Sequence, residues 1–288
     1  MEKPQVKFVE CPRDAMQGIK EFIPTEKKVA YLNTLLKVGF DTIDIGSFVS
    51  PKAIPQMADT AEVLSRIDRN GSKSKLLVIV ANERGAEQAA AQESISYLGY
   101  PFSISETFQQ RNTNTSIEGS WGRTVEIARI AKSAGKELVV YISMAFGNPY
   151  GDPWNAAVAM RWVERLVEEL DVRTIALSDT VGVARPEDIR SMFEALIPAR
   201  PDVLFGAHLH TTATNWKQKT QAAWEAGCRR FDGAIKGYGG CPMAEDELVG
   251  NLQTELFVQD LEEKGINTGL DLSWLDQAVG EAGRVFPV

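Results

Sequence analysis

Apolar segments that resemble strands alternate along this chain with segments whose apolar residues recur every three or four positions. The expected strands span residues 6–10, 42–48, 75–81, 100–105, 137–146, 174–180, 203–210 and 229–235. The helical pattern is clearest over residues 25–39, 120–135 and 156–171, and the helix-stopping glycines are Gly39, Gly135 and Gly227. Strands that alternate with helices form parallel sheets, so the pattern predicts an α/β protein.

Eight strand–helix units favour a closed (β/α)8 TIM barrel over an open, doubly wound sheet. A dinucleotide-binding sheet would carry Gly-x-Gly-x-x-Gly after its first strand, whereas this chain has Cys-Pro-Arg-Asp there. No linker divides the sequence. We therefore expect one catalytic barrel over residues 1–265, followed by a C-terminal extension over residues 266–288, where Trp274 and Leu275 predict a final helix that packs on the barrel.

Composition excludes several classes of protein. The chain has 288 residues and a net charge of −8, which argues against a nucleic-acid-binding surface. No apolar run reaches the roughly 18–20 residues of a membrane span, so we expect no membrane partner. The N-terminus is charged and unlike a secretory signal, and the three cysteines are too widely spaced for a disulfide framework. A cytoplasmic location is the simplest expectation.

Polar residues follow most of the expected strands, and in a TIM barrel these strand ends form the active-site rim. The most specific feature is His208-Leu-His210, which contains both histidines of the chain. Residues two apart on a strand point the same way, so both imidazoles can bind one divalent cation together with Asp14. Imidazole, carboxylate and amide ligands suit Mg²⁺ or Mn²⁺, with Zn²⁺ as a possible substitute. The alternative is a pair of histidines that simply form hydrogen bonds in a polar rim.

Each of the other polar positions has a structural and a functional interpretation. Arg13 and Asp14 form either a structural ion pair or a site in which Arg13 stabilises an oxyanion while Asp14 holds the metal. Asp44 is a satisfied buried carboxylate or a catalytic group, and Asp179 caps the next helix or acts in catalysis. Cys241 lies in a glycine-rich segment that can move as a lid over the site.

Six segments together resemble the family of 3-hydroxy-3-methylglutaryl-CoA lyases, within the metal-dependent TIM-barrel lyases and Claisen-type synthases. They are VKFVECPRDAMQ, DIGSFVSPKAIPQM, SISETFQQRNTNTSIE, SDTVGVARPEDI, GAHLHTT and GYGGCPMAEDELVGN. The stretch SFVSPKAIPQM separates the lyases from the isopropylmalate and homocitrate synthases. The resemblance implies an enzyme that cleaves 3-hydroxy-3-methylglutaryl-CoA to acetyl-CoA and acetoacetate with a divalent metal, and that forms a homodimer.

The resemblance also implies roles for individual residues. The metal ligands would be Asp14, His208, His210 and Asn251. The catalytic residues would be Arg13, which stabilises the enolate of the departing acetyl-CoA, the loop residue Cys241, and Asp179, with Asp44 or Asp179 as the base. The substrate-binding residues would be Gln17, Ser47 and Asn112.

The chain departs from the family pattern close to these positions. Asp44 stands where the family has Glu, Thr211 where it has Asp, and Met144 and Asn148 where it has two cysteines. Three alternatives therefore remain: a related metal-dependent aldolase or lyase acting on another acyl-CoA, a Claisen-type acyltransferase acting on a 2-keto acid, and a non-catalytic barrel that binds acyl-CoA.

Overall fold

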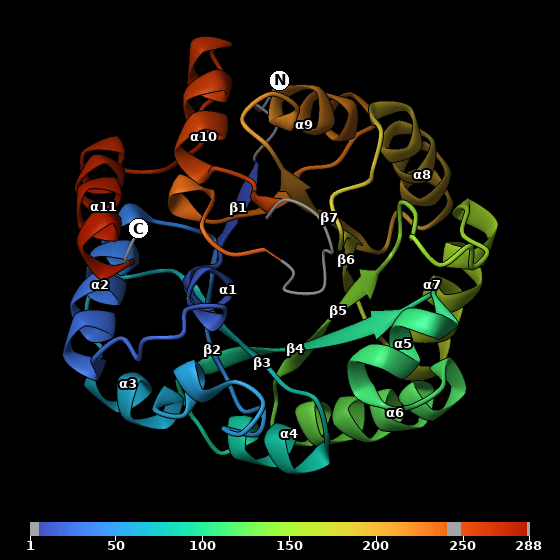
Figure 1. The fold of residues 1–288 in the computed structure, drawn as a ribbon, viewed down its shortest axis with the longest axis horizontal. Coiled ribbons are helices and arrows are strands. Elements are labelled where there is room, and N and C mark those ends of the chain that lie inside the picture. The colour runs from blue at the N-terminus through green and yellow to red at the C-terminus, as the bar shows by residue number, and fades with distance from the viewer. Residues whose placement is uncertain (1–5, 241–248, 287–288) are drawn as a thin grey trace.

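The computed structural model describes residues 6–240 and 249–286 and forms a closed parallel barrel, drawn in Figure 1. Each strand pairs with the next one along the chain, and β8 pairs with β1 to close the barrel. The strands are β1 (Lys7–Glu10), β2 (Thr42–Ser47), β3 (Lys75–Ile79), β4 (Ile95–Ser103), β5 (Glu137–Ser143), β6 (Thr174–Asp179), β7 (Leu204–Thr211) and β8 (Arg230–Gly233). The predicted TIM barrel is thus confirmed. A short additional strand, β9 (Gly250–Asn251), lies antiparallel to the end of β7.

The fourth strand begins at Ile95, earlier than the expected residue 100. Gly99 lies within this strand, where neighbouring side chains approach the backbone closely. A Cβ atom at this position would lie only 2.7 Å from the Ile79 Cδ1 atom and 2.9 Å from the Leu77 Cδ2 atom. The glycine therefore makes room for interior packing, which is a common reason for glycine within a strand.

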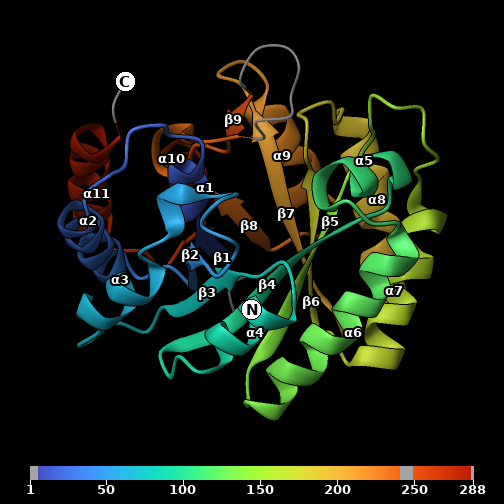
Figure 2. The same ribbon diagram turned by 60° about the horizontal axis from the view of Figure 1, so that its bottom comes forward.

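Helices surround the barrel and follow the strands in sequence, as Figures 1 and 2 show. They are α1 (Pro12–Gln17), α2 (Thr25–Val38), η1 (Pro55–Met57), α3 (Thr60–Arg66), α4 (Glu83–Ala90), α5 (Glu106–Thr113), α6 (Ile117–Ser133), α7 (Ala156–Leu170), α8 (Pro186–Ala199), α9 (Trp216–Glu225), η2 (Ile235–Gly237), α10 (Thr254–Glu263) and α11 (Leu272–Val285). Among these described helices, none is both long enough and apolar enough to cross a membrane.

The C-terminal helix predicted from Trp274 and Leu275 is α11, which packs against α2. Tyr31 of α2 and Phe286 meet edge to face, with ring centroids 5.6 Å apart. The Lys37 ammonium lies 4.3 Å from the centre of the Trp274 ring, a favourable cation–π distance. These contacts hold the C-terminal segment against α2, the second helix that follows β1.

The apolar core has two layers because successive strand residues point to opposite faces. A large cluster joins outward-facing strand residues such as Leu76 and Val78 to the surrounding helices. A smaller cluster consists only of strand residues and fills the barrel interior; it comprises Leu77, Ile79, Tyr97, Val139, Tyr141 and Ala176. A packed interior leaves the carboxyl ends of the strands as the place where polar groups can meet a ligand.

Candidate active site

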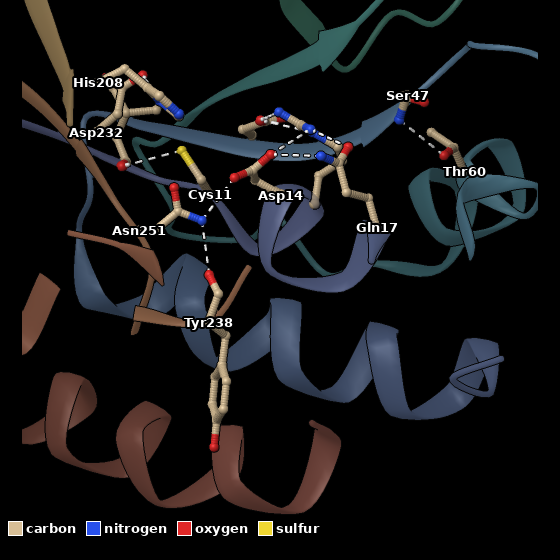
Figure 3. Close-up of polar contacts among 12 residues, drawn as sticks. Cys11, Asp14, Gln17, Ser47, Thr60, His208, Asp232, Tyr238 and Asn251 are labelled. Carbon is tan, nitrogen blue, oxygen red and sulfur yellow. Dashed lines mark hydrogen bonds and ion pairs between the residues drawn. The ribbon is translucent and has the colours of Figure 1, made fainter. Parts of the chain in front are cut away.

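The site is built around Asp14, which lies at the mouth of the barrel immediately after β1. Pro12 starts α1 and places Asp14 in its first turn, where the side chain is buried. The short strand β9 pairs Asn251 with His210 at the end of β7. The Asn251 amide nitrogen donates hydrogen bonds to Asp14 Oδ2 at 2.7 Å and to the Tyr238 carbonyl at 2.8 Å (Figure 3). The amide oxygen of Asn251 is therefore the atom left to face a ligand.

Asp14, His208 and His210 offer ligand atoms that all lie within 4.8 Å of one another, a geometry that suits a single metal ion. Each imidazole is oriented through Nδ1: His210 Nδ1 is 2.9 Å from the Thr180 carbonyl, and His208 Nδ1 is 3.3 Å from Asp232 Oδ2. The outward nitrogen Nε2 remains in each case. The Nε2 atom of His210 is buried and has no hydrogen-bond partner among the described residues. A buried unpaired imidazole nitrogen beside a carboxylate fits a cation.

The structure therefore brings together all four predicted ligands, Asp14, His208, His210 and Asn251. They supply one carboxylate, two imidazoles and one amide oxygen, from elements far apart in the sequence. This donor set matches the expected candidate metal site. The unpaired Nε2 of His210 favours this interpretation over that of two histidines that merely form hydrogen bonds.

The Arg13 guanidinium lies beside this metal site and is held by three side chains. Nε and Nη2 donate to Asp44 Oδ2 at 3.0 and 2.6 Å, while Nη1 donates to Asp14 Oδ1 at 2.9 Å and to Gln17 Oε1 at 2.7 Å. Gln17 in turn donates to Asp14 Oδ1 at 3.0 Å. The predicted ion pair of Arg13 and Asp14 thus exists and includes Asp44. A guanidinium carries five N–H donors, and these contacts use four of them.

Asp14 and Asp44 have opposite pKa shifts although both touch Arg13. Burial alone would raise the pKa of Asp14, but Arg13 and the two histidines lower it to about 2. Burial raises the pKa of Asp44 to about 6 even against the attraction of Arg13. The Oδ1 atom of Asp44 is buried and has no hydrogen-bond partner among the described residues. Asp44 is therefore a carboxylate with one free oxygen and a pKa close to neutrality.

The pKa values of the two histidines shift in opposite directions. Burial and the neighbouring His208 lower the pKa of His210, which keeps its imidazole neutral. Burial opposes the protonation of His208, but Asp232 raises its pKa overall. Because the neutral imidazole is the form that binds a cation, the lowered pKa of His210 favours that role.

Asp179 is at the end of β6 and, unlike Asp44, has hydrogen-bond partners for both carboxylate oxygens. Its Oδ2 atom accepts a hydrogen bond from the buried Lys219 ammonium at 2.6 Å, and its Oδ1 atom accepts one from the Ala184 amide at 3.0 Å. Asp179 is not the N-cap of α8, which is Arg185. Both oxygens of the carboxylate are engaged in holding the segment that follows β6.

The predicted substrate residues lie in different surroundings. Gln17 belongs to the Arg13 cluster, as described above. Ser47 ends β2 and borders a cavity of about 390 Å³, which is also lined by Thr60, Asn82 and Arg84. Asn112 is exposed on α5, outside the hydrogen-bonded cluster. Cys241 lies outside the described residues.

Two structural supports of the site, Asp232 and Lys219, are missing from the sequence-based prediction. Asp232 lies directly opposite His208 in the register of β7 and β8. Strand alternation on β8 places Asp232 on the same face as His208, but this signal requires knowing which strands are neighbours. Lys219 comes from α9, and its sequence position in a polar helix resembles that of a solvated lysine.

Known proteins match nearly the whole chain. The HMGL-like family model matches residues 5–279. The mitochondrial hydroxymethylglutaryl-CoA lyase of Bos taurus is 35% identical over 277 residues, which cover 95% of this chain and 83% of the bovine protein. The cytoplasmic 3-hydroxy-3-methylglutaryl-CoA lyase of Rattus norvegicus is 34% identical, with 93% of this chain and 77% of the rat protein covered.

The solved structures agree. An HMG-CoA lyase from Acinetobacter baumannii, in complex with coenzyme A and 3-methylmalate, superposes with a TM-score of 0.89 at 31% identity. The match covers 97% of this chain and 90% of that one. Similarity of this extent in both sequence and fold identifies the family. The chain belongs to the HMGL-like family of lyases, and it is an enzyme.

Proposed function

We propose that this enzyme cleaves 3-hydroxy-3-methylglutaryl-CoA to acetyl-CoA and acetoacetate with the help of a divalent metal ion. The observation that carries the proposal is the unpaired Nε2 atom of His210, buried beside Asp14 and His208 and close to Arg13. The lyase activity that the names of the bovine and rat relatives state supports it.

The metal would be held by Asp14, His208, His210 and Asn251, a donor set that suits Mg²⁺ or Mn²⁺, with Zn²⁺ as a possible substitute. When bound, such an ion polarises a substrate hydroxyl and lowers its pKa. The chain supplies the remaining groups. Asn251 already donates to Asp14, which fixes the carboxylate that would face the ion.

The proton of the tertiary hydroxyl goes to Asp44, whose Oδ1 atom is free and whose pKa of about 6 suits a base near neutral pH. The electron pair left on that oxygen forms the ketone of acetoacetate as the carbon–carbon bond breaks. The bonding pair of that carbon–carbon bond passes to the thioester, which becomes an enolate, and the remaining N–H of Arg13 donates to the enolate oxygen. Cys241 is proposed as the donor that protonates the enolate carbon to give acetyl-CoA.

Acyl-CoA is the proposed substrate class, and the cavity beside Ser47 supports it. The cavity borders the end of β2, and Arg84 on its lining is a cation that can pair with a phosphate. The Acinetobacter baumannii relative is described in complex with coenzyme A. We also propose that the enzyme forms a homodimer and is located in the cytoplasm. The catalytic barrel would end at residue 265, where the C-terminal extension begins.

The direct test is to incubate the purified enzyme with 3-hydroxy-3-methylglutaryl-CoA, with and without Mg²⁺ or Mn²⁺, and to follow acetoacetate and acetyl-CoA. We expect both products in equal amounts, only when metal is present. Arg13→Met is the control for catalysis by a contaminating lyase. Failure to form either product with any of the metals would contradict the proposal.

Asp44 also favours a second candidate, a related lyase or aldolase that acts on a different 3-hydroxyacyl-CoA. Its side chain is one methylene shorter than the glutamate that the family has at this position. The shorter side chain would leave more room next to the reacting carbon. A panel of 3-hydroxyacyl thioesters with substituents larger than methyl separates the two candidates by their kcat/KM values.

A further inference from the structure

A buried ion pair lies beneath His208, and the proposed mechanism does not use it. Arg230 and Asp232 are both on β8, and their side chains are only 2% and 0% exposed. Arg230 Nη1 lies 2.7 Å from Asp232 Oδ1. The neighbouring interior of the barrel is apolar, with residues such as Val139 and Ala176. Burying two charges there is costly, so the pair calls for a functional explanation.

Asp232 uses its two oxygens for different partners. The register of the parallel strands places it directly across from His208. Its Oδ2 atom is 3.3 Å from His208 Nδ1, while Oδ1 is held by Arg230. The carboxylate is thus held between a guanidinium on one side and an imidazole on the other. Tyr141 packs edge-on against the same imidazole, with ring centroids 5.7 Å apart, but an aromatic edge does not select which ring nitrogen carries the proton.

Gly206 provides the space for the guanidinium. It lies on the same face of β7 as His208, two residues earlier. A Cβ atom at Gly206 would lie 2.5 Å from Arg230 Nη1 and 3.1 Å from its Cδ atom. Any side chain at this position would therefore displace Arg230.

We propose that Arg230 is a positioning residue for the metal site, acting through Asp232 on His208. Arg230 fixes Asp232, and Asp232 holds the Nδ1 side of the imidazole, so that Nε2 is left toward the site shared with Asp14 and His210. This inference rests on the proposed function, because it assigns a partner to one of the proposed metal ligands. Carboxylates that hold metal-binding histidines in this way typically change affinity 10- to 100-fold when they are altered.

His210 provides the internal comparison. Its Nδ1 atom is held by the backbone carbonyl of Thr180, which no side-chain substitution removes. Arg230 should therefore affect the contribution of His208 and leave that of His210 unchanged.

The test measures Mn²⁺ affinity of the metal-free protein, from the electron paramagnetic resonance signal of free Mn²⁺ during a titration. We expect Arg230→Met to raise the dissociation constant roughly 10- to 100-fold. The matched control is Arg229→Met. Arg229 donates to the Trp224 and Cys228 carbonyls, stacks 3.9 Å from the Trp224 ring, and does not contact the metal site. The control should bind Mn²⁺ like the unmodified protein.

Arg230→Met removes the guanidinium that neutralises the buried Asp232 charge and can prevent folding, so two further variants accompany it. The double variant Arg230→Met/Asp232→Asn contains no unpaired charge, and Gly206→Ala keeps both charges while displacing the guanidinium. Both should weaken Mn²⁺ binding, with circular dichroism and thermal unfolding used to verify the fold. Unchanged affinity in the folded double variant would overturn the proposal, whatever the single variant does.

His210→Ala separates this inference from the proposed function. If His210→Ala binds Mn²⁺ as tightly as the unmodified enzyme, the metal site itself is wrong, and the inference falls with it. If His210→Ala loses Mn²⁺ while the folded Arg230 variants retain it, the metal site stands and only the positioning role of Arg230 is wrong.

Discussion

Asp44 lies within β2 and Asp179 is the last residue of β6, and each makes a buried ion pair at 2.6 Å. The partner of Asp44 is Arg13, and the partner of Asp179 is Lys219. The two carboxylates differ in their second oxygen. In Asp179 it accepts a hydrogen bond from the Ala184 amide, whereas in Asp44 it is buried without a partner among the described residues.

The comparison shows that an ion pair alone does not define the role of a buried carboxylate. Lys219 is a point charge whose three donors reach Asp179 and the carbonyls of Gly182 and His210, so it joins three chain segments. Arg13 instead directs Nε and Nη2 at one oxygen of Asp44, and the other oxygen is buried without a partner among the described residues. A base needs such a free oxygen, and a structural carboxylate does not.

The largest effect is expected for Asp44→Asn. If Asp44 is the base, its loss should lower kcat roughly 100- to 10,000-fold, the usual contribution of general base catalysis. Metal content, measured by elemental analysis, should stay unchanged because Asp44 is not a proposed ligand. A kcat within tenfold of the unmodified enzyme would remove Asp44 from the mechanism.

Arg13→Met should reduce turnover at least about 100-fold, because one oxyanion contact is worth on the order of 3 kcal/mol. The substitution also takes the cation away from Asp44, which raises the pKa of this carboxyl further. The measurement is steady-state kinetics at a saturating metal concentration. Nearly normal turnover would show that Arg13 serves only as a structural ion pair.

Lys219→Met should act on stability more than on chemistry. It leaves the Asp179 charge buried and unpaired, which typically costs about 3–5 kcal/mol of the free energy of unfolding. Chemical denaturation measures this loss, and Asp179→Asn is the companion variant. We expect the folded fraction of each variant to keep kcat within tenfold. If Asp179→Asn lowers kcat as strongly as Asp44→Asn does, Asp179 is a catalytic group and the comparison fails.

The smallest effect is expected in the pH profile. Asp44 accepts a proton only as a carboxylate, so kcat/KM should fall as the pH drops below about 6, the pKa to which burial raises this group. Asp179→Asn should retain this acid limb. An unchanged acid limb in the residual activity of Asp44→Asn would assign the limb to another group.

Most of the barrel could be predicted from sequence because its signals are local. Alternating apolar segments give the strands, and Gly39, which ends α2 in the left-handed conformation at a φ of 90°, marks a helix stop. The early start of β4 has no clear local signal, because the place of Gly99 within the strand depends on the approach of side chains from β3. The two-residue strand β9 has no sequence signal of its own, since it depends on pairing with β7.

The candidate site likewise contains features that local sequence signals predict and contacts that depend on the tertiary fold. The His208-Leu-His210 spacing is local, so the shared direction of the two imidazoles could be expected from strand geometry. Arg13 and Asp14 are adjacent in the sequence, so their proximity could also be expected. The contacts of Asp232 with His208 and of Lys219 with Asp179 depend on strand register and helix docking. Resemblance supplied Asn251, because no spacing rule links a residue so far along the chain to Asp14.

The hydrogen bond between Asp14 and Asn251 joins positions separated by 237 residues. At the usual synthesis rate of about 5–20 residues per second, the ribosome releases Asn251 roughly ten to fifty seconds after Asp14. Throughout that interval, Asp14 has been synthesised but Asn251, which donates a hydrogen bond to it in the folded protein, has not. A chain that is truncated before residue 251 would never acquire the Asn251 amide, so its candidate site would be incomplete.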